Sequence, residues 1–213
     1  MAVNDINAAN ARKVVDEIVA AGGQARAWAC DVSDEAAVQA MVMEIVEAFG
    51  TIHILVNNAS IFEKTPLEQA DAQTWERLLR INTIAPALLA RAAAPMMRAA
   101  NGGRIINLVD VLADRPIKRH GPYCASKAAL SALTRSLALE LAPQITVNGI
   151  APGIAVFPEE YDADLRQRLI ARVPLGREGT PEEVAALVRF LVAEGDYLTG
   201  QIINLDGGSS IRP

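Results

Sequence analysis

Helical and strand patterns alternate along the whole chain, and this alternation constrains the fold more than any single motif does. Apolar residues recur at helical spacing over residues 8–21 and 34–49. Further helices are predicted over about 72–100, over 122–141 and from Pro181 onward. Strands that alternate with helices are joined by right-handed crossovers and form a parallel sheet covered on both faces. The sequence therefore predicts an α/β fold with a doubly wound parallel sheet.

Short segments rich in Val, Ile and Leu lie between the predicted helices and are expected to be the strands. They are found at residues 1–5, 25–32, 52–58, 104–109, 145–150 and 201–205. A loop of about 20 residues is expected after the fifth of them. The chain contains no repeat, linker or low-complexity segment, so residues 1–213 are predicted to form a single domain.

Composition excludes several classes of function. The net charge of −5 gives no support for nucleic-acid binding, and no apolar run approaches the length that spans a membrane. Cys30 and Cys124 are too few for a disulfide framework, and His53 and His120 have no partners at metal-ligand spacing. We therefore expect a cytoplasmic protein that acts on a small molecule, without a metal, a membrane or a nucleic-acid partner.

Tyr123 and Lys127 are spaced to act together. Four residues apart at the start of a predicted helix, they lie on one face, one turn apart. A phenol with a pKa near 10 exchanges protons poorly at neutral pH, and an ammonium beside it favours the phenolate and lowers that pKa. Asp110 ends an apolar strand and is expected to reach, from the side of the sheet, the cleft in which Tyr123 and Lys127 lie. Its position also fits a strand-end cap or an ion-pair partner for Arg115.

The segment Y-C-A-S-K-A-A-L, residues 123–130, resembles the active-site signature of the short-chain dehydrogenases/reductases. Other parts of the chain resemble this family in the same order: Asp31-Val32, Asn57-Asn58-Ala59-Ser60, Asn82, Pro152-Gly153 and the segment T-G-Q-I-I-N-L-D-G-G at 199–208. The resemblance implies a Rossmann-like fold and a catalytic set of Asp110, Tyr123, Lys127 and Asn82. In that set the asparagine organises a water near the lysine.

The resemblance also implies a nicotinamide cofactor, NAD(H) or NADP(H). Its binding residues would be Asp5, Asp31, Val32, Asn58, Ala59, Ser60, Lys127, Pro152 and Gly153. Asp5 favours NAD(H), because an acid at the end of that strand bonds the ribose 2′-hydroxyl and repels a 2′-phosphate. The branch of the family that this chain most resembles mostly uses NADPH, so the choice between the two stays open. The family resemblance further implies a homo-oligomer, a tetramer.

Three features resemble the pteridine reductase branch. Asp110 stands where most members of the family have Ser, N-N-A-S replaces N-N-A-G, and Phe62 precedes Thr65-Pro66-Leu67. In that branch an Asp and the Tyr form an acid pair, and a Phe stacks on the flat pterin ring. Phe62 is therefore predicted to bind substrate, although an ordinary core position is the alternative.

One expected element is missing from the sequence. Members of this family begin with a strand and the glycine-rich turn T-G-x-x-x-G-x-G, whose backbone approaches the cofactor diphosphate at a helix N-terminus. No segment of these 213 residues matches it. We therefore expect a fold that is incomplete at its N-terminus and lacks its first βα unit. A central strand would be absent, and we expect the strands on either side to pair or the gap to be filled.

Three functions follow from these observations. The first is a nicotinamide-dependent reductase of the short-chain type that acts on a pterin or a related planar heterocycle. The second is a 3-oxoacyl or hydroxy-ketone reductase, against which Asp110 argues because such enzymes have Ser at that position. The third is a non-catalytic paralogue that lost cofactor binding together with the missing unit.

Overall fold

The computed structural model describes residues 1–158 and 161–211. Its strands are β1 (Ala2–Asp5), β2 (Arg26–Ala29), β3 (Ile54–Asn57), β4 (Gly103–Leu108), β5 (Ile145–Pro152) and β6 (Ile202–Leu205). Its α-helices are α1 (Ala8–Ala20), α2 (Glu35–Phe49), α3 (Ala72–Leu79), α4 (Ala85–Ala99), α5 (Gly121–Leu141), α6 (Ala163–Ile170) and α7 (Pro181–Ala193). All strand pairs are parallel, which confirms the predicted α/β fold.

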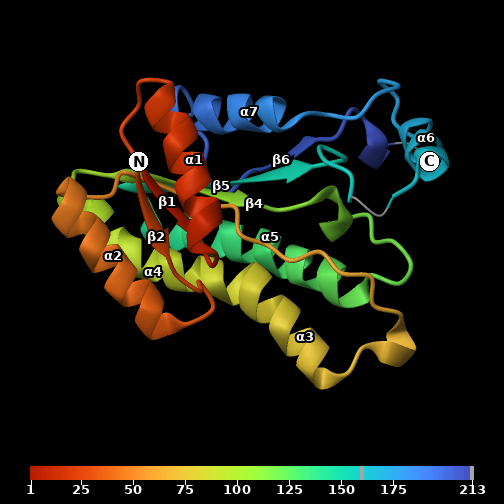
Figure 1. Cartoon of the computed structure of the whole chain (residues 1–213), viewed down its shortest axis with the longest axis horizontal. Helices are drawn as coiled ribbons and strands as arrows, with labels where there is room; N and C mark the ends of the chain where they lie inside the picture. The colour runs from red at the N-terminus through yellow and green to blue at the C-terminus, as the bar shows by residue number, and fades with distance from the viewer. Residues whose placement is uncertain (159–160, 212–213) are drawn as a thin grey trace.

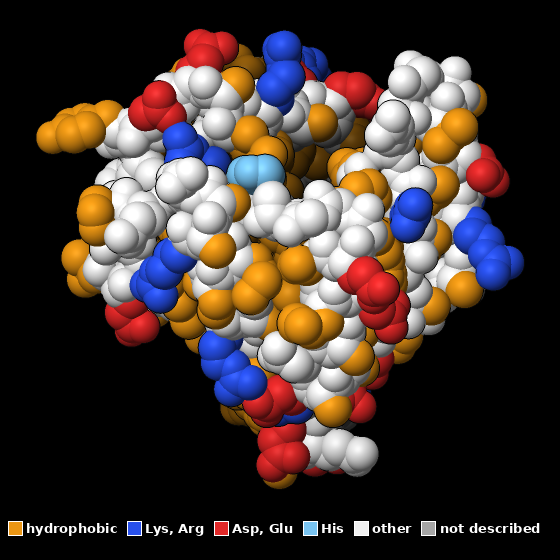
Figure 2. Space-filling model, turned by 90° about the vertical axis from the view of Figure 1, so that its left-hand side faces the viewer, with side chains coloured by type: hydrophobic (Ala, Val, Ile, Leu, Met, Phe, Trp, Pro, Cys, Tyr) orange, Lys and Arg blue, Asp and Glu red, His pale blue; other side chains and the backbone are white. Residues whose placement is uncertain are grey.

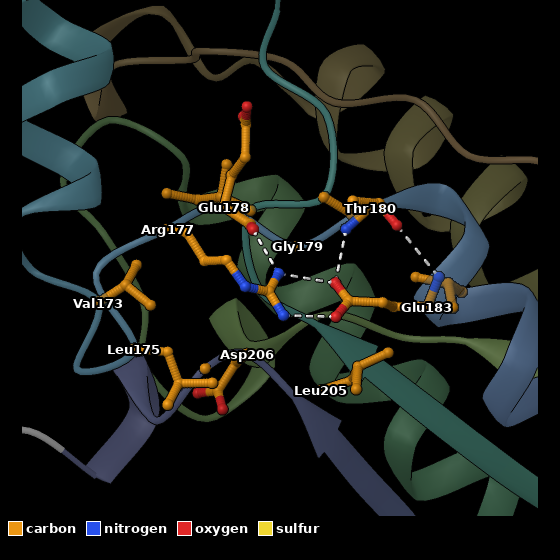
Figure 3. Close-up of a pocket in the computed structure, with 13 residues that line it drawn as sticks. Val173, Leu175, Arg177, Glu178, Gly179, Thr180, Glu183, Leu205 and Asp206 are labelled. Carbon is orange, nitrogen blue, oxygen red and sulfur yellow. Dashed lines mark hydrogen bonds and ion pairs between the residues drawn. The ribbon is translucent and has the colours of Figure 1, made fainter.

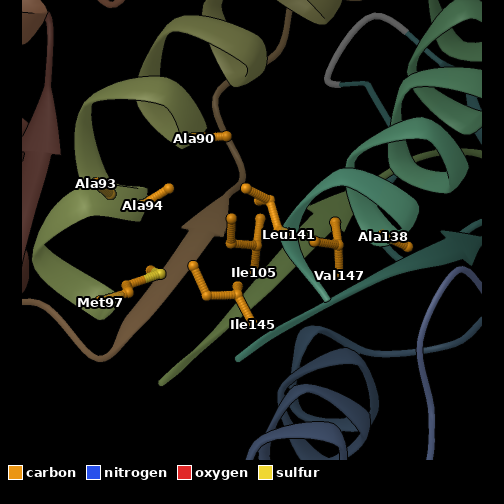
Figure 4. Close-up of a cluster of buried hydrophobic side chains, with 9 residues drawn as sticks. All are labelled: Ala90, Ala93, Ala94, Met97, Ile105, Ala138, Leu141, Ile145 and Val147. Carbon is orange, nitrogen blue, oxygen red and sulfur yellow. The ribbon is translucent and has the colours of Figure 1, made fainter. Parts of the chain in front are cut away.

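Figure 1 shows three layers, with α1 and α7 on one side of the strands and α2, α4 and α5 on the other. The hydrophobic core between α4, α5 and the strands is built largely from small side chains. Ala90, Ala93 and Ala94 of α4 lie against Ile105 of β4 and Val147 of β5 (Figure 4). Alanine lets a helix approach the strands closely, so the branched side chains of β4 and β5 fill the remaining space.

The sheet is divided into two parts, a pair β1-β2 and a sheet of order β3-β4-β5-β6. Among the described residues, the strands beside the gap do not pair and no segment fills the gap; filling by another chain stays a prediction. β1 and β3 instead line one cavity of about 890 Å³. Both strands of the pair β1-β2 pack against α1. Figure 2 shows a hollow among hydrophobic side chains on the side where the N-terminus lies in Figure 1.

The strand β3 is less buried than its sequence suggests. The apolar run around it predicts a strand buried on both faces, yet Ile54 and Val56 are 46% and 40% exposed. Leu55, which alternates with them, packs into the core clusters that include α4 residues. A strand needs a helix on each face to be fully covered, and α4 covers only one face of β3.

Two helical segments differ from the predicted pattern. The helix expected over about 72–100 is interrupted by a π-helical stretch, Arg80–Ile84, between α3 and α4. The short helix α6 lies within the expected long loop. Asp162 is its N-cap, and the Asp162 side chain accepts a hydrogen bond from the Leu165 N–H. No helix within the described residues has the length and apolar character needed to cross a membrane.

Candidate active site

The predicted catalytic residues lie at the carboxyl ends of neighbouring strands. Asp110 follows β4, residues 58–61 follow β3, and the N-terminal turns of α5 carry Tyr123 and Lys127. In a parallel sheet these ends share one edge, which is where open α/β sheets bind their ligands. The fold therefore brings together segments that are 50 or more residues apart in the sequence, such as Asn57 and Asn107.

Asp110 and Tyr123 form a direct pair. The Tyr123 hydroxyl donates to Asp110 Oδ2 at 2.6 Å, and the second carboxyl oxygen, Oδ1, accepts from the Leu112 N–H at 2.8 Å. Asp110 thus caps the short turn Val111–Ala113, as the alternative interpretation of the sequence held, and also contacts the predicted catalytic phenol. A carboxyl and a phenol this close can pass or share a proton with a ligand atom placed beside them.

The cleft changes the acidity of all three predicted catalytic groups. Burial raises the pKa of Asp110, and burial together with the Asp110 carboxyl raises the pKa of Tyr123. Burial lowers the pKa of Lys127 to about 8. The expectation that Lys127 lowers the pKa of Tyr123 is therefore not met, because desolvation and the neighbouring carboxyl outweigh the ammonium. Tyr123 is held as a neutral phenol, the form that donates a proton.

Lys127 is anchored to the strand rather than to Tyr123. Its Nζ donates to the Leu108 carbonyl at 2.8 Å and lies 5.9 Å from the centre of the Tyr123 ring. The residue is only 3% exposed. An ammonium has three N–H donors, so a buried lysine with one such bond retains donors that suit the hydroxyls of a ligand.

Asn82 occupies the middle of the π-helical stretch and is fully buried. Its Oδ1 accepts from the Ile61 N–H and the Ser60 hydroxyl, and its Nδ2 donates to the Ile61 carbonyl and to Ser126 Oγ. These four bonds use the full capacity of a side-chain amide. Asn82 therefore ties the segment after β3 to α5, while its predicted role in organising a water stays a prediction.

Phe62 lies at the mouth of the cleft, beside the catalytic tyrosine. Its ring is edge-on to Tyr123, with centres 4.8 Å apart and an interplanar angle of 89°. Phe62 is 41% exposed, which distinguishes it from an ordinary core residue. It also stacks on His120, a residue that the sequence gave no reason to place in the site.

Most of the predicted cofactor residues line the cavity between β1 and β3. The cavity wall includes Asp5, Asp31, Val32, Asn58, Ala59 and Ser60. Asp5 and Asp31 each use one carboxyl oxygen to accept from a nearby backbone N–H, those of Asn7 and Ser33. Pro152 and Gly153 lie apart from this wall, at the end of β5, and a Cβ on Gly153 would meet the backbone of Asp206 at 2.9 Å.

These residues fit part of a dinucleotide. Carboxylates at strand ends suit ribose hydroxyls, and the buried Lys127 suits hydroxyls on the nicotinamide side. The turn from β1 to α1, however, is Ile6-Asn7 and contains no glycine. Within the described ranges 1–158 and 161–211, no glycine-rich turn joins a strand to a helix beside this cavity. The described residues of the cavity wall thus include carboxylates suited to ribose hydroxyls, but no glycine-rich turn suited to a diphosphate.

Two buried polar groups of the site were missed by sequence reasoning. Ser126 donates to the Tyr123 carbonyl and accepts from Asn82. Asn107 joins β3 to α5, because it accepts from Asn57 and donates to the Thr134 hydroxyl, both at 2.8 Å. The position of Ser126 within Y-C-A-S-K gave a signal for the first, whereas the second depends on the register that places Asn57 opposite Asn107.

A second hollow, of about 70 Å³, lies beyond β5 (Figure 3). In this hollow Arg177 and Glu183 form a bidentate salt bridge, in which the two guanidinium nitrogens donate to the two carboxylate oxygens at 2.6 and 3.0 Å. Glu183 also belongs to the capping box with Thr180 that begins α7. These side chains are engaged with each other, so this hollow adds no group to the candidate active site.

Comparison with known proteins places the chain among oxidoreductases. Residues 1–210 match the family model described as enoyl-(acyl carrier protein) reductase. The chain is 35% identical to a sorbitol dehydrogenase of Cereibacter sphaeroides over 98% of this chain and 87% of that protein. It is 33% identical to a 3-oxoacyl-[acyl-carrier-protein] reductase of Thermotoga maritima over 96% and 85% of the two chains.

Solved structures agree with this placement. A 7α-hydroxysteroid dehydrogenase complexed with NADH and 7-oxo glycochenodeoxycholic acid superposes with a TM-score of 0.93 at 32% identity, over 97% of this chain and 83% of that one. A gluconate 5-dehydrogenase from Burkholderia cenocepacia, in complex with NADP and tartrate, also has a TM-score of 0.93 at 32% identity, over 100% and 86%.

Proposed function

The chain belongs to the short-chain dehydrogenase/reductase family of NAD(P)-dependent oxidoreductases, and we propose that it reduces a pterin or a related planar heterocycle. The observation that carries this proposal is the 2.6 Å hydrogen bond between Tyr123 and Asp110, a residue that stands where most of the family has Ser. A serine hydroxyl can donate or accept a hydrogen bond, but it is not an acid at neutral pH. A carboxyl group supplies a second acid for a substrate with more than one basic atom.

The acid pair suits a ring that contains several nitrogens. A nicotinamide bound beside the cleft would supply a hydride to the carbon of a C=N or C=O group. Tyr123 donates the proton to the heteroatom of that group, and its raised pKa keeps it protonated beforehand. The raised pKa of Asp110 favours the protonated carboxyl, which donates a hydrogen bond to a second ring atom.

The remaining residues hold the reactants. Lys127 would bind the ribose hydroxyls on the nicotinamide side, with Asp5 and Asp31 at the adenosine side of the cavity. Phe62 would stack on the flat ring, since its partly exposed ring lies beside Tyr123. Stacking on an aromatic ring contributes about 0.5–1.5 kcal/mol beyond the area that it buries. Phe62 would therefore select planar substrates over aliphatic ones.

A simple ketone or 3-oxoacyl group is the second candidate substrate. The names of the relatives favour it, because the matched proteins include sorbitol and galactitol dehydrogenases and 3-oxoacyl reductases. Such substrates need one acid, and Tyr123 alone provides it. Asp110 and Phe62 are the two residues that separate this candidate from the first.

We further propose that the 213 residues are a single short-chain domain that lacks its first βα unit. The cavity between β1 and β3 supports this, because the free edges of two parallel strands line it and a third strand parallel to both would complete one sheet. If the unit is absent in the cell, a non-catalytic paralogue is the third candidate function. Cofactor titration separates it from the first two.

We also propose a cytoplasmic homo-oligomer, a tetramer. Two features support it. Cys30 and Cys124 are both free and buried, as is usual in a reducing compartment. Several large apolar side chains are more than two-thirds exposed: Val156, Leu175, Leu139, Tyr197 and Ile211. Light scattering on the purified chain measures the number of subunits, and a monomer would contradict this proposal.

The substrate proposal is tested with Asp110→Ser, which restores the residue found in most of the family. Reduction of a dihydropterin and of an aliphatic ketone is measured with NADH and with NADPH. Both the parent and the variant carry an added N-terminal strand, T-G-x-x-x-G-x-G turn and helix, so that the nucleotide site is complete. We expect the variant to lose roughly tenfold or more in kcat/KM for the pterin, as is typical when one acid group is removed, and to keep its ketone rate. Equal pterin turnover in the two proteins would contradict the acid role of Asp110.

A further inference from the structure

His120 is a buried ring that nothing in the catalytic set explains. It immediately precedes α5, is 6% exposed and makes no side-chain cap to that helix. Its Nδ1 lies 2.9 Å from the Lys118 carbonyl. Because a carbonyl only accepts, Nδ1 is the donor in this contact. Nε2 is buried and has no hydrogen-bond partner among the described residues.

The contact that His120 does make is with Phe62. The two rings are stacked, with centres 4.9 Å apart and an interplanar angle of 18°. Phe62 is in turn edge-on to Tyr123 at 4.8 Å. The three rings form a continuous series from the start of α5 to the catalytic phenol, in which His120 supports one face of the phenylalanine.

The segment that carries Phe62 is also fixed on either side of it. Before Phe62, Asn82 bonds both backbone groups of Ile61. After it, the Thr65 N–H donates to the Arg119 carbonyl at 2.6 Å, and Thr65 forms a bridge with His120. Arg119 has a φ of +67°, a backbone conformation that only a few non-glycine residues adopt, and it is held there beside this bridge.

We propose that His120 is a positioning residue that sets the selectivity of the site for planar rings by holding Phe62 beside Tyr123. The proposal rests on the function argued above. A ring that is already fixed in its binding position loses little entropy when a ligand stacks on it. The Nδ1 bond to Lys118 fixes the imidazole within its own turn, and the imidazole then fixes the phenylalanine. His120 itself touches no reacting atom in this arrangement.

Two substitutions of similar size separate the ring from its polarity. His120→Phe keeps a ring that stacks on Phe62, whereas His120→Gln keeps a polar side chain and loses the ring. We expect His120→Gln to weaken dihydropterin binding by roughly 3- to 10-fold, the range that one aromatic pair supports. His120→Phe should stay close to the parent. His53→Ala is the matched control for loss of an imidazole. His53 is exposed and lines the cavity at the amino end of β3, whereas Phe62 follows the carboxyl end of that strand.

The experiment is equilibrium dialysis of a dihydropterin against the parent, the two His120 variants, His53→Ala, Phe62→Ala and the double variant Phe62→Ala/His120→Gln. If His120 acts through Phe62, the double variant binds no more weakly than Phe62→Ala alone. Additive losses, or parent-like binding by His120→Gln, would overturn the positioning role. Urea unfolding midpoints of the same proteins identify any variant that fails to fold. If His120→Gln does not fold, His120→Phe provides the test, and weak dihydropterin binding by a folded His120→Phe would overturn the positioning role.

The same series distinguishes this inference from the proposed function. If the parent binds no dihydropterin, the substrate class is wrong, and the selectivity inferred for His120 is wrong with it. If the parent binds and Phe62→Ala weakens binding but His120→Gln does not, the substrate class stands and only the role of His120 is refuted. An aliphatic ketone serves as the second ligand, and His120→Gln should weaken its binding less than it weakens dihydropterin binding.

Discussion

At the scale of single residues, the site is governed by burial more than by charge pairing. Asp110, Tyr123 and Lys127 lie within hydrogen-bonding or ring distance of one another. Each has a pKa displaced toward its neutral form, and burial is the first cause in every case. A cleft that favours neutral acids is prepared to donate protons, which is what the reductive direction requires.

Tyr123→Phe removes the proton donor while keeping the ring. We expect turnover to fall by about 10²–10⁴-fold, the usual contribution of a positioned acid, with little change in the circular dichroism spectrum. Steady-state kinetics with a ketone and a dihydropterin provide the measurement. Tyr197→Phe is the control, because Tyr197 is fully exposed and should keep the parent rate. A Tyr123→Phe enzyme with parent-like kcat would rule out the phenol as donor.

Lys127 makes stability depend on pH in a definite direction. Its pKa is about 8 when folded, against 10.5 for an unperturbed lysine, so between these values the unfolded chain binds more protons than the folded one. The free energy of unfolding therefore rises with pH across this window, and the advantage is lost as pH falls toward 8. In Lys127→Met this contribution is absent. Urea unfolding at pH 7 to 10 should show a steeper rise for the parent, and parallel curves would contradict the prediction.

At the scale of elements, buried polar side chains link strands to helices through hydrogen bonds. These bonds are directional, so they fix the relative positions of the elements more closely than hydrophobic packing alone does. Asn107 of β4 links Asn57 of β3 to Thr134 of α5 within the buried layer. Asn82 does the same between the π-helical stretch, the segment after β3 and α5. A π-helical turn inside a longer helix often marks a functional site, and here it is the turn that carries Asn82.

Asn107→Ala removes the acceptor of the buried Asn57 amide and the donor to the Thr134 hydroxyl, which then keeps only its bond to the Leu130 carbonyl. We expect the free energy of unfolding to fall by about 1–3 kcal/mol, the cost of unsatisfied buried groups. Thr146→Val is the opposite case, because the buried Thr146 Oγ1 has no hydrogen-bond partner within the described residues and valine has the same shape. This variant should be neutral or stabilising. Chemical unfolding of both proteins, compared with the parent, tests the pair, and equal losses would contradict the reasoning.

At the scale of the whole molecule, the division of the sheet into two parts leads us to expect weak cofactor binding. Backbone N–H groups at a helix N-terminus normally supply much of the affinity for a diphosphate. The described part of this chain offers carboxylates, Lys127 and the residues after β3 instead. These contacts alone must offset the cost of immobilising a large flexible ligand.

We expect residues 1–213 to bind NADH and NADPH very weakly and to turn over slowly. The chain extended at its N-terminus by a strand, a T-G-x-x-x-G-x-G turn and a helix should bind both nucleotides more tightly and recover activity. Calorimetric titration of each nucleotide into the two proteins gives the dissociation constants. Micromolar binding by residues 1–213 would show that another segment supplies the phosphate site, and it would also argue against a non-catalytic paralogue.

The sequence by itself determined the order and type of the main elements and the segment that contains the catalytic residues. Local patterns are sufficient for this, because helical spacing and the Tyr123–Lys127 interval are both read within a few residues. The pairing of Asp110 with Tyr123 also followed from the sequence as an expectation, since the end of a strand and the start of the next helix meet at one sheet edge.

The tertiary structure alone decided how these groups behave and what surrounds them. Burial, which no local pattern specifies, reversed the expected direction of the Tyr123 pKa. The stacking of His120 on Phe62 depends on a bridge between loops 55 residues apart, Thr65 and His120. The exposure of β3 and the separation of the sheet into two parts depend on which edges find partners. Each is a property of contacts between distant segments, so each becomes visible only when the chain is folded.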